Sequence, residues 1–251
     1  MDELQLQLLI DLHRSNFRQG PGGEAETQKA LKLAGVDRSR PLKIVDIGCG
    51  TGASTILLAK ELDGEITAVD FLEEFLEELK LKAEKHGVAE KITTLNCSMD
   101  TLPFADEVFD VIWSEGAIYN MGFATGVAAW SRFLKPGGKL IVSEITWLTA
   151  ERPPELQLHW DAEYPEIDVA SAKIGILEQH GYCFEAYFYL PSPCWLENYY
   201  HPLQSGFDAF LERNDQSPQA KKVVEGEKAE IALYEKYRDF YSYGVYVAKK
   251  M

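Results

Sequence analysis

Hydrophobic positions along the chain follow two spacings, and together they predict an α/β fold. Leucines at helical spacing predict a helix over residues 4–17, and a second helix is expected to end at Ala34, before Gly35. From Lys43 onward, short β-branched runs alternate with helical patterns. The predicted strands cover 43–47, 65–70, 91–97, 109–114 and 139–144, and the predicted helices between them cover 53–62, 72–85 and 122–134.

Strands that alternate with helices of this length imply a parallel sheet with helices on both faces. After Glu144 a Pro-containing stretch, 149–165, leads into a helix that ends at His180, and two more strands follow at 182–190 and 240–249. The 49 residues of 191–239 are too many for a hairpin loop and predict further helices. The sequence thus predicts a Rossmann-like, doubly wound, seven-stranded and mostly parallel sheet, with N-terminal helices and a helical insertion before the last strand.

Charge and composition narrow the function classes. The chain has 25 Lys and Arg against 40 Asp and Glu, a net charge of −15, which disfavours a nucleic-acid partner. Its apolar runs are shorter than the ~18 residues of a membrane span, and the N-terminus lacks the basic start of a secretory signal. Its four cysteines form no C-x-x-C pair. We therefore expect a cytoplasmic protein with reduced thiols and no stable membrane insertion.

The run from Val45 to Ala53 contains three closely spaced glycines where a strand meets a helix. Glycines at such a junction allow a tight turn and let a ligand lie against the backbone. Asp70 follows Gly48 by 22 residues, at the end of the next strand. In a parallel sheet its carboxylate would lie beside the same loop, where it could accept hydrogen bonds from both hydroxyls of a ribose.

This loop alone fits two ligand classes, because its spacing also satisfies the dinucleotide pattern G-x-G-x-x-G/A. Asp46, two residues before the first glycine, would face a pyrophosphate unfavourably. It could instead orient loop amides, meet a cationic ligand, or only cap the turn.

Motifs at matching intervals make residues 41–144 resemble the class I S-adenosylmethionine-dependent methyltransferases, in particular the ubiquinone/menaquinone-biosynthesis type. These motifs are the glycine loop, Asp70-Phe71, the segment 98–104, the strand 109–115 and the turn 134–138. The resemblance implies S-adenosyl-L-methionine as cofactor. It also implies a cofactor site built from Asp46, Gly48, Gly50, Gly52, Asp70, Phe71, Ser98, Met99, Asp100, Ser114 and Glu115.

The family's roles carry over by position. The loop glycines would cradle the methionine part, and Asp70 would bind the ribose. Met99 would pack on the adenine, and Asp100 would accept from its exocyclic amine. Backbone groups of 114–116 would meet the methionine amine. Arg18 and Gln19, beside an N-terminal glycine turn, either reach the cofactor carboxylate or form a solvated helix end.

Methyl transfer from a sulfonium is a direct displacement, so orientation is the main contribution of the enzyme. Candidate catalytic residues are Glu115, as a base or as an acceptor for the cofactor amine, and Tyr119, as a wall of the methyl site or as a packing aromatic. No acidic cluster has metal-ligand spacing, so no metal is expected.

The resemblance also suggests how a single domain over 1–251 is divided. We expect an N-terminal helical lid (1–40), a cofactor-binding core (41–144) and a substrate-side half (145–251) that includes a cap insertion (191–239). The insertion carries aromatic residues suited to an apolar acceptor pocket: Trp195, Tyr199, Tyr200, Phe207 and Phe210. The alternatives are an ordinary auxiliary core or a contact between copies, and a homodimer is among the expected partners.

Four functions remain open. The favoured one is methyl transfer to a small, aromatic or otherwise planar molecule. The second is an NAD(P)-dependent oxidoreductase, which the glycine loop permits. A nucleic-acid methyltransferase would usually show Asn/Asp-Pro-Pro-aromatic after the fourth strand, where this chain has Ser-Glu-Gly-Ala at 114–117. The fourth is a non-catalytic cofactor-binding module.

Overall fold

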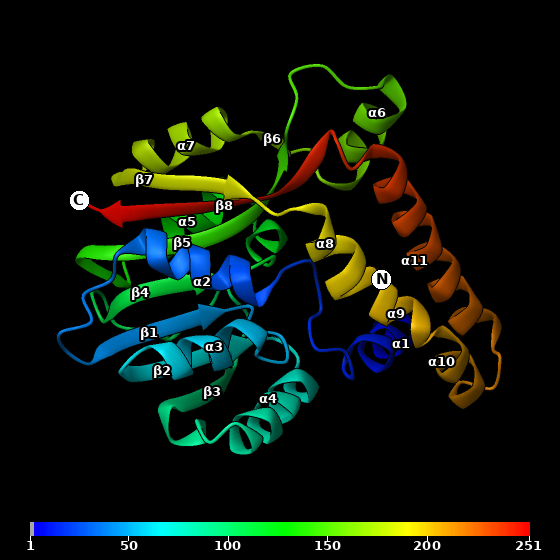
Figure 1. The fold of residues 1–251 in the computed structure, drawn as a ribbon, viewed down its shortest axis with the longest axis horizontal. Coiled ribbons are helices and arrows are strands. Elements are labelled where there is room, and N and C mark those ends of the chain that lie inside the picture. Colours follow the sequence, from blue (N-terminus) through cyan, green and yellow to red (C-terminus); the bar gives the residue numbers. More distant parts are fainter. Residues whose placement is uncertain (1–2) are drawn as a thin grey trace.

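The computed structural model describes residues 3–251, so the first two residues of the predicted lid lie outside the described part. A single sheet forms the centre of the molecule (Figure 1). Its strands are β1 (Leu42–Ile47), β2 (Gly64–Asp70), β3 (Ile92–Asn96), β4 (Phe109–Ser114), β5 (Leu134–Trp147), β6 (Asp168–Val169), β7 (Tyr182–Tyr189) and β8 (Tyr241–Lys250).

The strand order is β3-β2-β1-β4-β5-β8-β7, with the short β6 paired to β5. Strands β1 to β5 pair in parallel, and β8 runs antiparallel to both of its neighbours. The chain leaves β1 toward β2 on one side and returns to β4 on the other. Ligands of open α/β sheets bind where the strand order reverses in this way, outside the carboxyl ends of the strands. The predicted doubly wound, mostly parallel fold is confirmed.

Helices and short turns connect the strands. They are α1 (Glu3–His13), α2 (Glu24–Ala34), α3 (Ala53–Glu61), α4 (Glu73–Lys85), η1 (Ala89–Lys91), η2 (Ile118–Asn120), α5 (Phe123–Ser131), α6 (Pro154–Glu163), α7 (Ala170–Gln179), α8 (Ser192–Trp195), the π-turn η3 (Leu196–Tyr200), α9 (His201–Ser205), α10 (Phe207–Arg213) and α11 (Pro218–Tyr237). In the part of the chain that is described, no helix is long and apolar enough to cross a bilayer.

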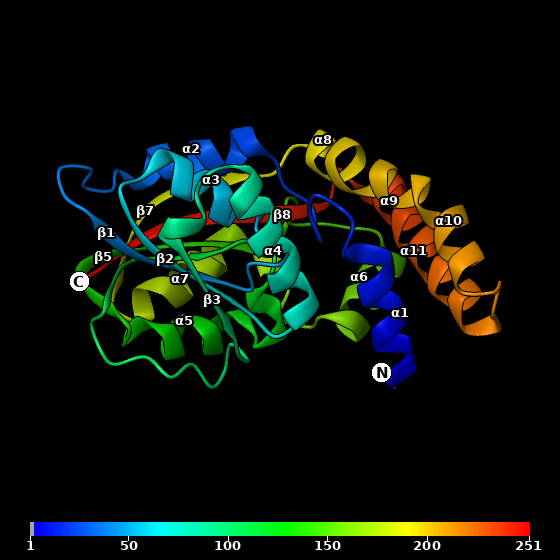
Figure 2. The same ribbon diagram turned by 90° about the horizontal axis from the view of Figure 1, so that it is seen from below.

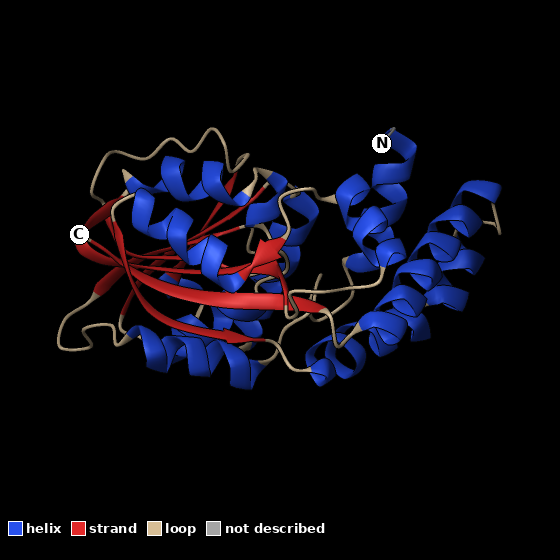
Figure 3. Ribbon diagram, turned by 90° about the horizontal axis from the view of Figure 1, so that it is seen from above, coloured by secondary structure: helices blue, strands red, loops and turns tan. Residues whose placement is uncertain are grey.

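Both faces of the sheet are covered (Figure 3). Ile44 and Trp113 point into the hydrophobic cluster under α2, α3 and α4, while their neighbours Val45 and Ile112 point into the cluster under α5 and α7. Successive side chains of a strand face opposite sides, so a strand buried on both faces is apolar at consecutive positions. This explains why the first strands show no polar alternation in the sequence.

Helices α8 to α11 and the turn η3 form a helical unit, residues 192–237, that projects beyond one end of the sheet (Figure 2). Helix α1 packs against α10 and α11, so the N-terminus joins this unit. Helix α11 begins as the sequence predicts: the Ser217 hydroxyl oxygen accepts a hydrogen bond from the Ala220 amide, and Pro218 occupies the first helical position.

Two local features differ from the sequence prediction. The proline-containing stretch 149–165, for which the sequence predicts no element of its own, holds helix α6, and Pro153 and Pro154 stand at its start, where a missing N–H costs nothing. Strand β5 extends well beyond 139–144, and a short eighth strand, β6, pairs with its end. Residues Ile145–Trp147 of the extension pair with β8, about a hundred positions later, so no local pattern reveals them.

A buried ion pair joins β5 to α7. The Lys173 ammonium lies 3.0 Å from the Glu144 carboxylate, with Lys173 only 1% exposed and Glu144 fully buried. Lys173 also donates to the carbonyl oxygen of Glu166 and lies over the ring of Phe123. Burial raises the pKa of Glu144, and the charge of Lys173 opposes that shift.

We expect Lys173→Met to lower the free energy of unfolding by about 3–5 kcal/mol, because it leaves the Glu144 carboxylate buried without a cation. Urea denaturation measures this change. The matched control is Lys236→Met, whose ion pair with Glu155 is exposed and should contribute no more than about 1 kcal/mol. Equal effects of the two substitutions would contradict the assignment of Glu144–Lys173 as a structural pair.

Candidate active site

A cavity of about 790 Å³ lies at the carboxyl ends of the strands, where the order reverses between β1 and β4. It is lined by the glycine loop, the end of β2, the segment after β3, the segment after β4 and the N-terminal turn. Most of the site residues expected from the sequence line it: Gly48, Gly50, Asp70, Phe71, Ser98, Met99, Asp100, Glu115 and Tyr119.

The glycine loop follows β1 with a backbone that side chains would disturb. Gly48 has φ +74°, and a Cβ there would collide with the Cβ of Ala117 across the cavity wall. Gly52, with φ +87°, forms the N-cap of α3, and a Cβ there would collide with Leu79. Glycine is therefore required both for the left-handed conformation and for the close approach of neighbouring segments.

Asp70 holds the loop from the neighbouring strand. Its carboxylate accepts a hydrogen bond from the Gly50 amide at 2.8 Å and another from the Leu72 amide at 2.9 Å. Burial raises the pKa of Asp70, and these amide hydrogen bonds oppose the shift. The carboxylate thus lies beside the glycine loop, as its sequence position predicts.

The segment after β3 forms another wall. The Ser98 hydroxyl donates to the Asp100 carboxylate, which lowers the pKa of Asp100. The Met99 carbonyl oxygen accepts from the indole N–H of Trp130 at 3.2 Å, so the backbone beneath the methionine side chain is anchored to α5. Phe71, which also lines the cavity, is 65% exposed. These residues offer an apolar slot with a carboxylate at its edge.

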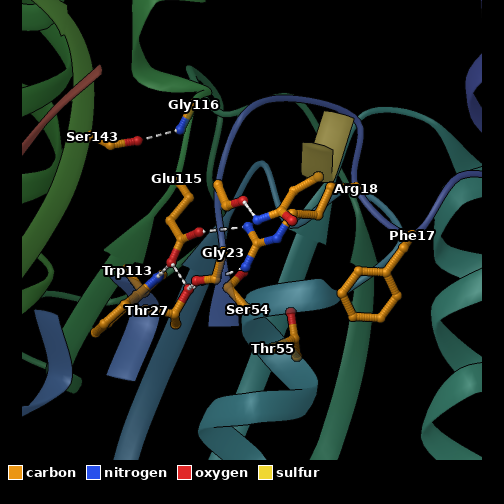
Figure 4. A network of polar contacts seen from close by, with 12 residues as sticks. Phe17, Arg18, Gly23, Thr27, Ser54, Thr55, Trp113, Glu115, Gly116 and Ser143 are labelled. Carbon is orange, nitrogen blue, oxygen red and sulfur yellow. Dashed lines mark hydrogen bonds and ion pairs between the residues drawn. The ribbon is translucent and has the colours of Figure 1, made fainter. Parts of the chain in front are cut away.

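Arg18 enters the cavity from the N-terminal turn and pairs with Glu115 (Figure 4). Its guanidinium donates to the Glu115 carboxylate at 2.9 Å and to the Thr27 hydroxyl at 3.2 Å. Glu115 also accepts from Thr27 and from the indole N–H of Trp113. Arg18 is only 7% exposed, so the alternative of a solvated helix end does not describe it.

Gln19 ties the same turn to the glycine loop. Its side-chain oxygen accepts from the Thr51 amide at 2.8 Å, and its amide nitrogen donates to the carbonyl oxygens of His13 and Asn16. Residues 18 and 19 therefore close the cavity with one cation and one amide. The sequence marks them only by their position beside a glycine turn.

Three expected residues do not line the cavity: Asp46, Gly52 and Ser114. Ser114 is buried and donates to the Ile47 carbonyl oxygen, which links β4 to β1 behind the loop. Asp46 is fully buried and accepts from the hydroxyls of Ser54 and Thr55 at 2.8 and 2.7 Å. It thus holds the first turn of α3, and its other carboxylate oxygen has no hydrogen-bond partner among residues 3–251.

The buried Asp46 predicts a pH dependence of stability, because burial raises its pKa from 3.8 to about 7. Between about pH 4 and pH 7 the unfolded chain has lost the Asp46 proton, while the folded chain still holds it. The free energy of unfolding should therefore fall as pH rises from 4 to 7, by an amount on the order of 2–4 kcal/mol. Below the window both states are protonated, and above it the loss is complete.

Asp46→Asn should flatten this part of the stability curve. Urea unfolding of both proteins at about pH 5 and about pH 8 measures the difference. Other acids with raised pKa values, such as Asp70 and Glu144, titrate in both proteins and cancel in the comparison. Parallel curves for the two proteins would show that Asp46 keeps an ordinary pKa in the fold.

The aromatic residues assigned to the cap divide into two groups. Trp195, Tyr200, Phe207 and Phe210 are at most 4% exposed and pack into the core of the helical unit; none of them lines the cavity. For these four the auxiliary-core alternative describes what the structure shows. Tyr199 is 8% exposed and does not line the cavity either, but its ring stacks on His13 of α1 at a centroid distance of 6.2 Å. Burial raises the pKa of Tyr199, and the charges of Glu230 and Glu227 add to this shift.

Tyr243 is a site neighbour that the sequence did not reveal. The hydroxyl of Tyr243, on β8, lies 4.0 Å from the position that a Cβ of Gly116 would take. Gly116 lines the cavity, and its amide donates to the Ser143 hydroxyl of β5 at 2.7 Å. Only the antiparallel placement of β8 beside β5 brings these positions together.

No group of three or more His, Cys, Asp and Glu side chains suited to a metal ion occurs in the described part of the chain.

Comparisons with known proteins agree with this geometry. Residues 44–138 match the methyltransferase domain family. A demethylmenaquinone methyltransferase from Bacteroides fragilis is 35% identical over 121 residues, which are 47% of this chain and 49% of that protein. The chain thus spans about half the length of the curated relatives it matches.

Two solved structures share the whole fold. A S-adenosylmethionine-dependent methyltransferase from Geobacter sulfurreducens, solved with S-adenosyl-L-homocysteine, has a TM-score of 0.84 at 18% identity and is covered over 98% of both chains. The [4+2]-cyclase SpnF has a TM-score of 0.77 at 20% identity, with 98% of this chain and 94% of that chain covered. At this identity the likeness concerns the fold alone.

Fold, motifs and family match define one class of domain. Residues 44–138 match a methyltransferase domain, and the whole chain shares its fold with solved S-adenosylmethionine-dependent methyltransferases. The resemblance expected from the sequence is confirmed for this domain, and neighbours solved with S-adenosyl-L-homocysteine agree with the expected cofactor class.

Proposed function

We propose that this chain binds S-adenosyl-L-methionine in the cavity and transfers its methyl group to a small molecule with an aromatic or otherwise planar part. The observation that carries the proposal is the convergence of Asp70, the glycine loop and the Met99 segment on one cavity. The Asp70 carboxylate suits the ribose of this cofactor. The glycine loop suits its methionine part, and the apolar slot at Met99 suits its adenine.

The loop amides favour this cofactor over a dinucleotide. Each amide from Gly48 to Gly52 already donates to an acceptor within the protein: Val69, Asp70, Gln19 and Cys49 supply these oxygens. A pyrophosphate needs free amides at such a loop, and here it would also meet the carboxylate of Asp70, which lines the cavity. The oxidoreductase alternative therefore lacks its main binding contacts.

In the proposed complex each residue has a limited task. Asp70 would hold the ribose, Met99 would cover the adenine, and Arg18, held by Glu115, would face the carboxylate of the methionine part. The cofactor supplies an electrophilic methyl on a positively charged sulfur. Glu115 already accepts from three donors, which favours an orienting task over that of a general base. Tyr119, 40% exposed at the cavity, would form part of the wall between the two ligands.

The acceptor would reach the methyl from the side of the helical unit and α1. Collinear alignment of acceptor, methyl carbon and sulfur can contribute ~7–11 kcal/mol, provided that both ligands are held rigidly. The N-terminal segment supports this rigidity, since Gln19 and Arg18 close the cavity over the loop. We therefore assign residues 1–40 a lid role, with 191–239 on the acceptor side. A cytoplasmic location, a homodimer and the absence of a nucleic-acid partner stay predictions.

We expect Asp70→Ala to weaken binding of S-adenosyl-L-homocysteine by roughly 1.5–3 kcal/mol, the scale of hydrogen bonds to a charged group. Isothermal titration calorimetry measures the affinity. Asp106→Ala is the control, because Asp106 is exposed and pairs with Arg132 away from the cavity. Unchanged affinity in Asp70→Ala would exclude the ribose contact.

Methyl transfer itself is tested with a labelled methyl donor and a panel of phenols, quinone precursors and aromatic amines. Label should appear in at least one of these molecules and disappear when the donor is omitted. Binding of NAD in calorimetry, without binding of S-adenosyl-L-homocysteine, would overturn the proposal.

A further inference from the structure

A cluster of tyrosine and glutamate side chains lies beside the cofactor cavity, and the proposed cofactor contacts do not account for its two glutamates. We call it the tyrosine–glutamate cluster. It comes from five separate elements: α1, η2, η3, α11 and β8. Its members are His13, Tyr119, Tyr199, Glu227, Glu230 and Tyr243.

The cluster adjoins the cavity at two points. Tyr119 lines the cavity, and the Tyr243 hydroxyl lies 4.0 Å from the Cβ position of Gly116, which also lines it. From there the cluster extends to α11. Tyr243 stacks on Trp195, and Trp195 lies against Tyr200. The Tyr200 hydroxyl donates to Glu230 of α11. The cluster therefore reaches from the cofactor cavity to the helical unit.

Its acidic end is formed by one face of α11. Glu227 and Glu230 are three positions apart, so their side chains lie on the same side of the helix. The Glu230 carboxylate accepts from the Tyr200 hydroxyl at 2.9 Å and forms no ion pair within residues 3–251. Solvent reaches Glu230, while desolvation by the surrounding protein raises its pKa. Glu230 is thus reachable from solvent and at the same time surrounded by protein.

Unpartnered polar atoms are the second observation. Glu227 is 9% exposed, and one of its carboxylate oxygens accepts only from the His13 ring, at 3.2 Å. Its other oxygen and the Nδ1 atom of His13 are buried and have no partner in the described part of the chain. Leaving such atoms unpaired costs about 1–3 kcal/mol each. A ligand that donates hydrogen bonds would recover this cost.

The walls are aromatic. The His13 ring stacks on Tyr199 at a centroid distance of 6.2 Å, and Tyr243 stacks on Trp195 at 5.3 Å. Aromatic faces attract cations, and two carboxylates that form no ion pair with Lys or Arg within residues 3–251 favour a positive charge. Neutral hydroxyl ligands would leave the excess negative charge uncompensated, and an anion would be repelled by it.

We propose that the tyrosine–glutamate cluster recognises a positively charged nitrogen, a protonated amine, carried by the methyl acceptor. Glu230 receives the ammonium group together with Glu227, and the tyrosine rings enclose the carbon atoms next to it. The amine serves as the recognition group, with the methylated atom held nearer to Gly116. This inference rests on the proposed function and specifies its substrate class.

The test uses the full chain saturated with S-adenosyl-L-homocysteine and three probes of similar size: phenethylamine, 2-phenylethanol and phenylacetate. Calorimetry should show phenethylamine binding at least tenfold more tightly than the other two probes. Glu230→Gln should weaken phenethylamine at least tenfold and leave 2-phenylethanol within twofold. Glu225→Gln is the matched control, because Glu225 lies on the same helix, is exposed and forms no ion pair within residues 3–251.

Each outcome decides the proposal. Equal or tighter binding of 2-phenylethanol or phenylacetate, or binding of no probe at all, would overturn it. If Glu230→Gln fails to fold, as shown by loss of S-adenosyl-L-homocysteine binding, Glu227→Gln replaces it with the same expected loss. Failure of the wild-type chain to bind S-adenosyl-L-homocysteine would instead contradict the proposed function, since that ligand does not touch the acidic end of the cluster.

Discussion

The hydrogen bond between the Gly50 amide and the Asp70 carboxylate holds together the two strand ends on which the cavity depends. β1 and β2 are adjacent and parallel, so their carboxyl ends lie at one edge, but the glycine loop would be free to collapse into the space beside β4. Asp70 fixes the loop at its centre, and Val69 and Gln19 fix it on either side. A preformed cavity results, and a ligand need not order the loop when it binds.

The N-terminal segment contacts the cavity residues although it lies far from some of them in sequence. Arg18 pairs with Glu115 almost a hundred positions away, and Thr27 and Trp113 hold the same carboxylate. Because the pair is largely shielded from solvent, its geometry matters more than that of an exposed ion pair. The cavity and the N-terminal segment therefore share one polar network.

The helical unit has a double role. Most of its aromatic side chains pack against one another, and Trp195 stacks on Tyr234 at 4.4 Å. This packing stabilises the helical unit at the edge of the sheet. Its Tyr199 and the acidic face of α11 belong to the tyrosine–glutamate cluster, which we propose as the acceptor side. The same fold occurs in a protein named as a [4+2]-cyclase. The shared fold therefore does not determine the reaction. In our proposal the side chains of the helical unit and of α1 that belong to the tyrosine–glutamate cluster select the ligand.

The sequence by itself determined the parts that depend on neighbours along the chain. The order of strands and helices, the loop at Gly48–Gly52, the left-handed Gly35 and the cap at Ser217 all follow from local spacing and backbone freedom. Tertiary structure alone decided the burial of Arg18 and Asp46, the extension of β5 along β8, and the placement of Tyr243 beside Gly116. These features join segments from tens to more than a hundred residues apart, and their contacts exist only once the sheet order is set.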